Sequence, residues 1–126
     1  MSSDRTEVLV VDAANVVGSV PDGWWRDRAG ATRRVYAGLA ETTTGFDQVV
    51  FVVEGRARAG VPAGTEGRIT TVHAEGEGDD EIVVQCEALA AEGATVTLAT
   101  ADRGLIARVA PFGVHIIGPR TIRDFD

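Results

Sequence analysis

Residues 8–16 read Val-Leu-Val-Val-Asp-Ala-Ala-Asn-Val, and the apolar run in this stretch predicts a buried β-strand that ends at an acid. A second run of the same kind, Val-Val-Phe-Val-Val, occupies residues 49–53. Near-continuous apolar runs are typical of strands covered on both faces, as in a parallel sheet. The two runs therefore predict an α/β fold in which helices flank a mainly parallel sheet.

The rest of the chain alternates strand-like and helix-like segments. The predicted strands are short segments rich in Val, Ile and Phe, at residues 7–11, 49–53, 69–73, 95–99 and 114–117. The predicted helices cover residues 24–41, 80–91 and 103–110, with Asp79 as the N-cap of the second. The Gly- and Arg-rich segment 54–68 has no helical period and is predicted to be an open loop. This order predicts a three-layer α/β fold with about five strands and right-handed crossovers.

Length and charge limit the functions that this chain can have. Its 126 residues are enough for one domain, and we predict a single domain over residues 1–126. The formal net charge of −7 argues against tight, non-specific binding of nucleic acid, although all twelve basic residues are arginine. No apolar stretch is long enough to span a membrane, and residues 1–6 lead into a strand without a signal-peptide core. We therefore predict a cytoplasmic protein with no membrane partner, whose single cysteine, Cys86, is a buried thiol.

Acidic residues follow four of the predicted strands. Asp12 follows the first, Glu54 the second and Asp102 the fourth, while Gly-Glu-Gly-Asp-Asp-Glu follows the third at residues 76–81. Ligands of such sheets bind beyond the carboxyl ends of the strands, so these acids are expected at one edge. Any one of them has an ordinary alternative as a helix N-cap, where a carboxylate accepts backbone hydrogen bonds and meets the positive helix end.

A set of acids at one edge also has a chemical meaning. Converging carboxylates repel each other and lose hydration, and such an arrangement is tolerated mainly when a cation lies between them. Oxygen ligands without a nearby His or Cys favour Mg²⁺ or Mn²⁺ over zinc. His73 and His115 lie in or beside strands and are predicted to be structural. The acids therefore predict a site for Mg²⁺ or Mn²⁺.

Three short motifs resemble the NYN group of PIN-like domains, in particular its YacP-like branch. The opening stretch at residues 8–16 is similar to the D-G-x-N opening of these domains. Gly-Asp-Asp-Glu-Ile-Val at residues 78–83 resembles their acidic helix start, and Ala-Thr-Ala-Asp at residues 99–102 resembles their T-S-D turn. The resemblance implies a PIN-like (Rossmannoid) fold with strand order 3-2-1-4-5, a divalent metal, and endoribonuclease activity. It also implies products with a 5′-phosphate and a 3′-hydroxyl.

The resemblance implies a role for each matched residue. Asp12 would be the central metal ligand, and Asn15 would orient that ligand or the phosphate. Asp79 would be the second acid and Asp102 the third. Asp80 is the alternative second acid. Because neighbouring helix residues point about 100° apart, both are not expected to face one ion directly.

Residues outside these matched positions include one more candidate metal ligand and one difference from the family motif. Glu54 stands where YacP-like sequences tend to have an acid, and it could hold the metal through water. Ala13 and Ala14 replace the glycine and the aromatic residue often found inside the first motif. The departure bears on how closely the substrate backbone can approach the first strand.

Arginine and tryptophan residues near the acidic edge are the candidate substrate contacts. Those predicted to bind substrate are Arg26, Arg56, Arg58, Arg103, Trp24 and Trp25. Arginine pairs with phosphate, and Trp beside Arg can stack nucleobases. Two alternatives stay open, because each arginine could be a solvated surface residue and the Trp pair could anchor the first helix to the sheet.

Other classes of protein share parts of this pattern. A dehalogenase-type phosphatase also uses an Asp after the first strand, but it needs a second Asp at position 14, which is Ala here. Receiver domains and these phosphatases use a lysine, which this chain lacks, and neither G-x-G-x-x-G nor a P-loop occurs. The main alternative to an enzyme is a non-catalytic PIN-like module that binds RNA, the ribosome or a protein partner. RNA is the partner predicted for the enzyme, while ribosome association and homodimer formation are left open.

Overall fold

The sheet of this protein is built from its most apolar segments. In the computed structural model, which describes residues 5–123, six strands form one sheet in the order β3-β4-β2-β1-β5-β6. They are β1 (Glu7–Asp12), β2 (Gln48–Val53), β3 (Gly64–Glu66), β4 (Ile69–His73), β5 (Thr95–Ala99) and β6 (His115–Ile117). Neighbouring strands pair in parallel, except β3 with β4. The predicted strands thus lie in the predicted order, and β3 is an additional edge strand.

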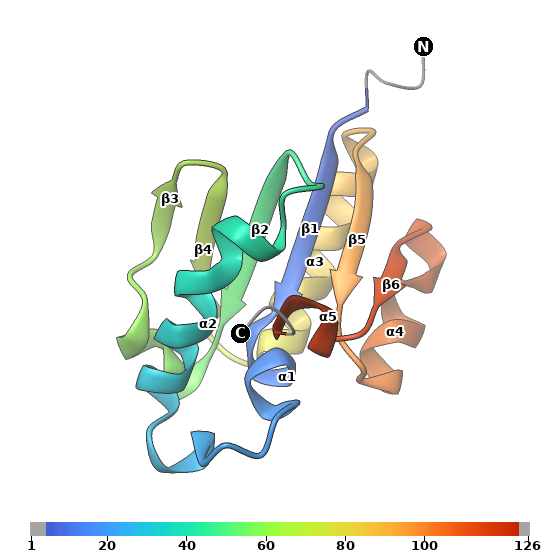
Figure 1. The fold of residues 1–126 in the computed structure, drawn as a ribbon. Helices are drawn as coiled ribbons and strands as arrows, with labels where there is room; N and C mark the ends of the chain where they lie inside the picture. Colours follow the sequence, from blue (N-terminus) through green and yellow to red (C-terminus); the bar gives the residue numbers. More distant parts are fainter. Residues whose placement is uncertain (1–4, 124–126) are drawn as a thin grey trace.

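Helices cover both faces of the sheet, as Figure 1 shows. They are α1 (Ala13–Gly18), α2 (Arg28–Thr42), α3 (Gly78–Ala91), α4 (Arg103–Val109) and α5 (Arg120–Arg123). Short 3-10 turns are η2 (Trp24–Arg26), η3 (Gly55–Gly60) and η4 (Ala110–Phe112). Within residues 5–123, no helix is long and apolar enough to cross a membrane. The arrangement confirms the predicted three-layer α/β class.

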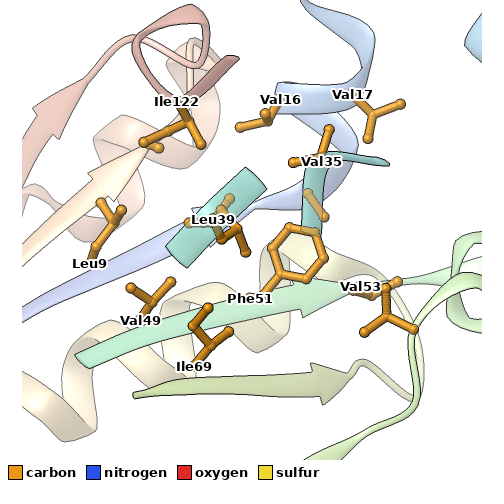
Figure 2. Close-up of a cluster of buried hydrophobic side chains, with 14 of the residues drawn as sticks. Leu9, Val16, Val17, Val35, Leu39, Val49, Phe51, Val53, Ile69 and Ile122 are labelled. Carbon is orange, nitrogen blue, oxygen red and sulfur yellow. The ribbon is translucent and has the colours of Figure 1, made fainter. Parts of the chain in front are cut away.

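Each face of the sheet has its own core. Successive side chains of a strand point to opposite faces, so Leu9 of β1 packs towards α1 and α2 while Val10 packs towards α3 and α4. Figure 2 shows the first core, in which Phe51 of β2 and Leu39 of α2 are fully buried. Cys86 lies in the second core, and burial raises the pKa of its thiol to about 12. Cores on both sides hold the carboxyl ends of β1, β2 and β5 in fixed positions.

The predicted helix 24–41 is wrong at its start. Residues Trp24–Arg26 form the separate turn η2, and α2 begins only at Arg28. Asp27 interrupts the helix because its φ of −151° is not helical and its Oδ1 accepts a hydrogen bond from the Gly30 N–H at 2.9 Å. The Trp pair therefore lies on a loop beside α2 rather than within it.

Two helix starts near the acidic edge also differ from the prediction. The short helix α1, which the sequence pattern does not predict, follows β1 directly because the side chain of Asp12 caps it. Asp79 is not the N-cap of α3, since Glu77 occupies that position without a side-chain cap and Asp79 lies in the first turn. These differences place Asp12 and Asp79 at the helix starts that border the carboxyl edge of the sheet.

The segment 54–68 is not an open loop. It contains the turn η3 and the strand β3, which folds back on β4 as a hairpin. Gly67 makes the connecting turn with a φ of 60°, in the left-handed region that favours glycine. All residues of β3 are exposed, so this strand has no apolar pattern that a sequence prediction could detect.

A close approach between η3 and α2 requires glycine at position 60. Gly60 is buried, and a Cβ atom there would overlap the backbone oxygen of Ala29. We expect Gly60→Ala to lower the free energy of unfolding by about 1–3 kcal/mol, because backbone must shift to make room. Gly38→Ala is the matched control, since nothing lies within 4 Å of a Cβ at this α2 position. Gly38→Ala should raise the free energy of unfolding, measured in urea, by roughly 0.5–1 kcal/mol. Equal effects of the two changes would contradict the close approach of η3 to α2.

Candidate active site

The carboxylate of Asp12 is buried at the carboxyl end of β1. Only 5% of the residue is exposed. Its Oδ1 accepts a hydrogen bond from the Asn15 backbone N–H at 3.3 Å, and its Oδ2 accepts one from Thr100 Oγ1 at 2.9 Å. In the described part of the chain, no arginine or histidine forms an ion pair with Asp12. The predicted central ligand is therefore held rigidly, and its charge has no cationic partner there.

Asn15 and Thr100 join the ends of β1 and β5. Asn15 Oδ1 accepts a hydrogen bond from the Ala101 N–H at 2.9 Å. Thr100 Oγ1 donates to Asp12 and accepts from the Asp102 N–H at 3.2 Å, so one hydroxyl connects two of the predicted acids. Because Asn15 Oδ1 is occupied, its NH₂ group is left to donate, and it has no partner among residues 5–123.

The other predicted acids come from β2, α3 and α4. Glu54 follows β2 and packs over Gly78, where an added Cβ would lie 2.6 Å from Glu54 Oε1. Asp79, half-buried, comes next in the chain. Asp102 caps α4, because its Oδ1 accepts a hydrogen bond from the Leu105 N–H at 3.1 Å. The alternative reading of Asp102 as a helix cap is thus confirmed, and its Oδ2 is the oxygen left for a ligand.

These acids act on one another electrostatically. Burial raises the pKa of Asp12 from 3.8 to about 6. The hydrogen bonds that Asp12 accepts lower this pKa, while the charges of Asp79 and Glu54 raise it. Burial also raises the pKa of Asp79, and the charges of Asp102 and Glu54 raise it further, while Arg108 lowers it. Carboxylates from four separate elements therefore affect one another through their charges at this edge. Even so, no three His, Cys, Asp or Glu side chains in the described residues are close enough to hold one ion together.

Asp80 lies apart from these neighbours. Its side chain is 66% exposed, and its Oδ1 accepts a hydrogen bond from Arg108 Nη2 at 2.9 Å in an ion pair between α3 and α4. Arg108 also lowers the pKa of Asp79 and so lies near the acidic edge. Asp79, and not Asp80, therefore interacts electrostatically with the other acids, and Arg108, which the sequence pattern does not single out, also lies near this edge.

The metal-free protein is expected to lose stability as the pH rises through about 6. The pKa of Asp12 in the folded protein, about 6, lies above the ordinary 3.8, so the folded state binds this proton more tightly than the unfolded state. The resulting stabilisation is complete below pH 3.8 and is lost above pH 6, and it falls by roughly 1 kcal/mol between about pH 5 and pH 8. Urea unfolding should show this decrease in the wild type but not in Asp12→Asn. A variant that keeps the whole decrease would contradict the burial of this charge.

Arginine and tryptophan side chains line hollows beside the acidic edge. A hollow of about 290 Å³ is lined by Glu54, Trp24, Arg28 and Arg56, among others. A neighbouring one of about 240 Å³ is lined by Trp25, Arg26, Arg28 and Arg56, among others. Trp24 is half-buried, with the Arg28 guanidinium 5.4 Å from its ring centroid, whereas Trp25 is 53% exposed. Trp24 thus serves partly as the hydrophobic anchor of the alternative interpretation and still faces open space.

The remaining predicted substrate arginines differ from each other. Arg58 Nε donates to the Gly55 carbonyl oxygen at 3.2 Å and its Nη1 to that of Ala74 at 3.4 Å, so this side chain holds η3 against the loop after β4. Arg103 is exposed at the start of α4, directly after Asp102. Of the two, Arg103 is the one whose charge is available to a ligand.

A protein of known structure shares this arrangement of strands and helices. The crystal structure of Rae1 (YacP) from Bacillus subtilis, a W164L mutant, superposes on this chain with a TM-score of 0.70. The two share 18% sequence identity over 93% of this chain and 72% of that one. No protein family model and no curated protein sequence matches this chain. The chain therefore has a YacP-like fold, as its sequence motifs predict.

Proposed function

We propose that this chain is a metal-dependent endoribonuclease that hydrolyses RNA phosphodiester bonds at the acidic edge of its sheet. The observation that carries this proposal is the position of Asp12, which is buried at the carboxyl end of β1 without a cationic partner in the described residues and is joined to Asp102 through the Thr100 hydroxyl. Helix capping does not account for Glu54 and Asp79, whose side chains cap no helix. The YacP-like fold supports the proposal, because the resemblance of the sequence motifs to that family implies endoribonuclease activity.

The residues at this edge fit a hard divalent cation. All candidate ligands are carboxylate oxygens, which favour Mg²⁺ or Mn²⁺. Asp12 is buried without a cationic partner in the described residues, and a buried charge of this kind is costly unless it is compensated. Asp12, Asp79 and Asp102 would hold the ion, with Glu54 bound through water. Since like charges repel, three carboxylates are expected to meet at one point only when a cation joins them.

The protein side of the reaction follows from the hydrogen bonds at this edge. When bound, the ion would polarise the phosphodiester and stabilise the charge of the transition state. Thr100 and the Asn15 backbone hold Asp12 in one orientation, so little rearrangement is needed when substrate arrives. The NH₂ group of Asn15 can donate to a phosphate oxygen, and the guanidinium of Arg108 adds a positive charge at the same edge.

A second candidate function is a non-catalytic module that binds RNA, the ribosome or a protein partner. The observation in its favour is that no three of the described acidic, His or Cys side chains already share one point. Ala13 and Ala14, which depart from the motif, point the same way. This candidate predicts binding without cleavage, so one assay separates the two.

The test is a cleavage assay on a 5′-labelled single-stranded RNA in millimolar Mn²⁺ or Mg²⁺. We expect cleavage that EDTA abolishes, with fragments that carry a 5′-phosphate and a 3′-hydroxyl. Product ends can be typed with phosphatase and ligase, which separates this chemistry from contaminating ribonucleases that leave 3′-phosphates. RNA that is bound but stays intact in both metals would favour the non-catalytic module instead.

A further inference from the structure

A pocket of about 650 Å³ adjoins the acidic edge on the side of β5. Asn15 and Ala101, which are hydrogen-bonded to each other, form part of its wall. Trp24 and Gly18 line it from the other side, and Arg120 at the start of α5 completes it. Figure 1 shows α5 beside α1, where the chain returns to the carboxyl end of the sheet. Its volume lies within the range of pockets that hold small molecules, and it shares a wall with the candidate active site.

The lining of this pocket favours an aromatic, anionic ligand. Trp24 provides an aromatic surface, and Gly18 and Pro119 leave room beside it. Arg120 supplies a positive charge, and no acidic side chain lines the pocket among residues 5–123. In a chain with 19 acidic and 12 basic residues, that absence of acids sets this surface apart. A nucleotide combines the two properties that such a pocket would bind, a flat base and a negative phosphate.

The pocket continues past Trp24 into the other hollows. Trp24 and Ala14 line both the 650 Å³ pocket and the 290 Å³ hollow, so the two meet at these residues. Arg28 and Arg56 line the second hollow and the third. Glu54 also lines the second hollow and Asp27 the third, so of these three only the 650 Å³ pocket has an arginine and no acid in its described lining.

We propose that the 650 Å³ pocket holds one unpaired nucleotide of the RNA next to the cleaved bond, with its base against Trp24 and its phosphate at Arg120. The identity of the ligand as RNA rests on the proposed function. The base must be free of its pairing partner to enter the pocket, so the substrate is a single strand or loop rather than a duplex. The pocket, rather than the acids, then decides which RNA segments are bound.

Binding is tested without cleavage by fluorescence anisotropy of a labelled single-stranded RNA of mixed sequence, about eight nucleotides long, in EDTA. Gly18→Leu fills the pocket. A Cβ at Gly18 would lie 3.8 Å from Trp24, which is ordinary contact, and the backbone there does not need glycine. Gly38→Leu is the matched control, because Gly38 is also helical but lines none of the three hollows. We expect Gly18→Leu to raise Kd by about tenfold or more, which is the loss of one stacked base, and Gly38→Leu to leave it unchanged.

The phosphate contact is tested by Arg120→Ala, with Arg34→Ala as its control, since Arg34 is exposed on α2 and lines none of the three hollows. We expect Arg120→Ala to weaken binding and to lower the slope of log Kd against log salt by about 0.7, the value for one phosphate of a single strand. Arg34→Ala should leave the slope unchanged. Equal slopes for the two variants would overturn the contact at Arg120.

These binding measurements test the pocket independently of the proposed nuclease activity. Equal affinities of Gly18→Leu and Gly38→Leu, or no RNA binding by the wild type, would overturn the pocket even if the wild type cleaves RNA. A selective loss in Gly18→Leu would support the pocket even if no metal produced cleavage. Duplex RNA or single-stranded DNA of the same sequence that binds as tightly as the single-stranded RNA would overturn its assignment to unpaired RNA.

Discussion

Asp12→Asn is expected to reduce metal-dependent RNA cleavage by about a thousandfold or more while the protein stays folded. Asp12 is the one candidate ligand that is buried, and both of its oxygens are fixed by hydrogen bonds. Without this ligand, the ion's stabilisation of the transition-state charge would fall by several kcal/mol. About 1.4 kcal/mol corresponds to each tenfold change in the cleavage rate. Single-turnover cleavage in Mn²⁺ measures the effect.

The fold should tolerate this change because the neighbouring groups can adapt. Asparagine keeps one oxygen to accept from Asn15, and the Thr100 hydroxyl can rotate to accept from the new NH₂ group. Asp47→Asn is the matched control, since Asp47 accepts from the Glu7 N–H at the opposite end of the sheet, at 2.8 Å. Equal cleavage rates in the wild type and Asp12→Asn would place the activity elsewhere or in a contaminant.

Asp79→Asn is expected to reduce the cleavage rate by about a hundredfold, and each tenfold corresponds to about 1.4 kcal/mol of lost transition-state stabilisation. Asp80→Asn should reduce the rate by less than about threefold. Asp79 interacts electrostatically with Asp12, Glu54 and Asp102, whereas Asp80 is exposed and paired with Arg108. The two variants make the same chemical change at adjacent positions, so each is a control for the other. Calorimetry with Mn²⁺ should show weaker binding for Asp79→Asn alone.

The reverse ranking would reassign the second acid. If Asp80→Asn lost the activity and Asp79→Asn kept it, the ion pair with Arg108 would have to open when metal binds. Equal, small effects of both changes would remove α3 from the site and support the non-catalytic module.

Most of the sheet could be predicted because its signal is local. The apolar runs of β1 and β2 are dictated by burial on both faces, and each is visible within a few residues. The exposed strand β3 lacks such a run and is stabilised by its pairing with β4. The break before α2 depends on the side chain of Asp27 capping the backbone at Gly30, a contact that the helical pattern does not reveal.

The candidate site was predictable where topology alone determines it. Parallel strands place their carboxyl ends at one edge, so Asp12, Glu54 and Asp102 could be grouped from their positions after strands. Thr100 could not be identified in this way, because its bond to Asp12 joins residues 88 positions apart. Arg120 lines the pocket only because α5 returns beside α1. Such contacts depend on how the elements pack, which the local pattern does not encode.

The metal site itself is tested most directly by anomalous diffraction from crystals of the protein soaked in millimolar Mn²⁺. We expect an anomalous peak from Mn²⁺ at the carboxyl edge, with the ion bound by oxygens of Asp12, Asp79 and Asp102 and linked to Glu54 through water. Asp12→Asn crystals treated in the same way should lose this peak. A well-ordered acidic edge without a peak, or a peak only at Asp80 and other surface acids, would contradict the assignment of this edge as a metal centre.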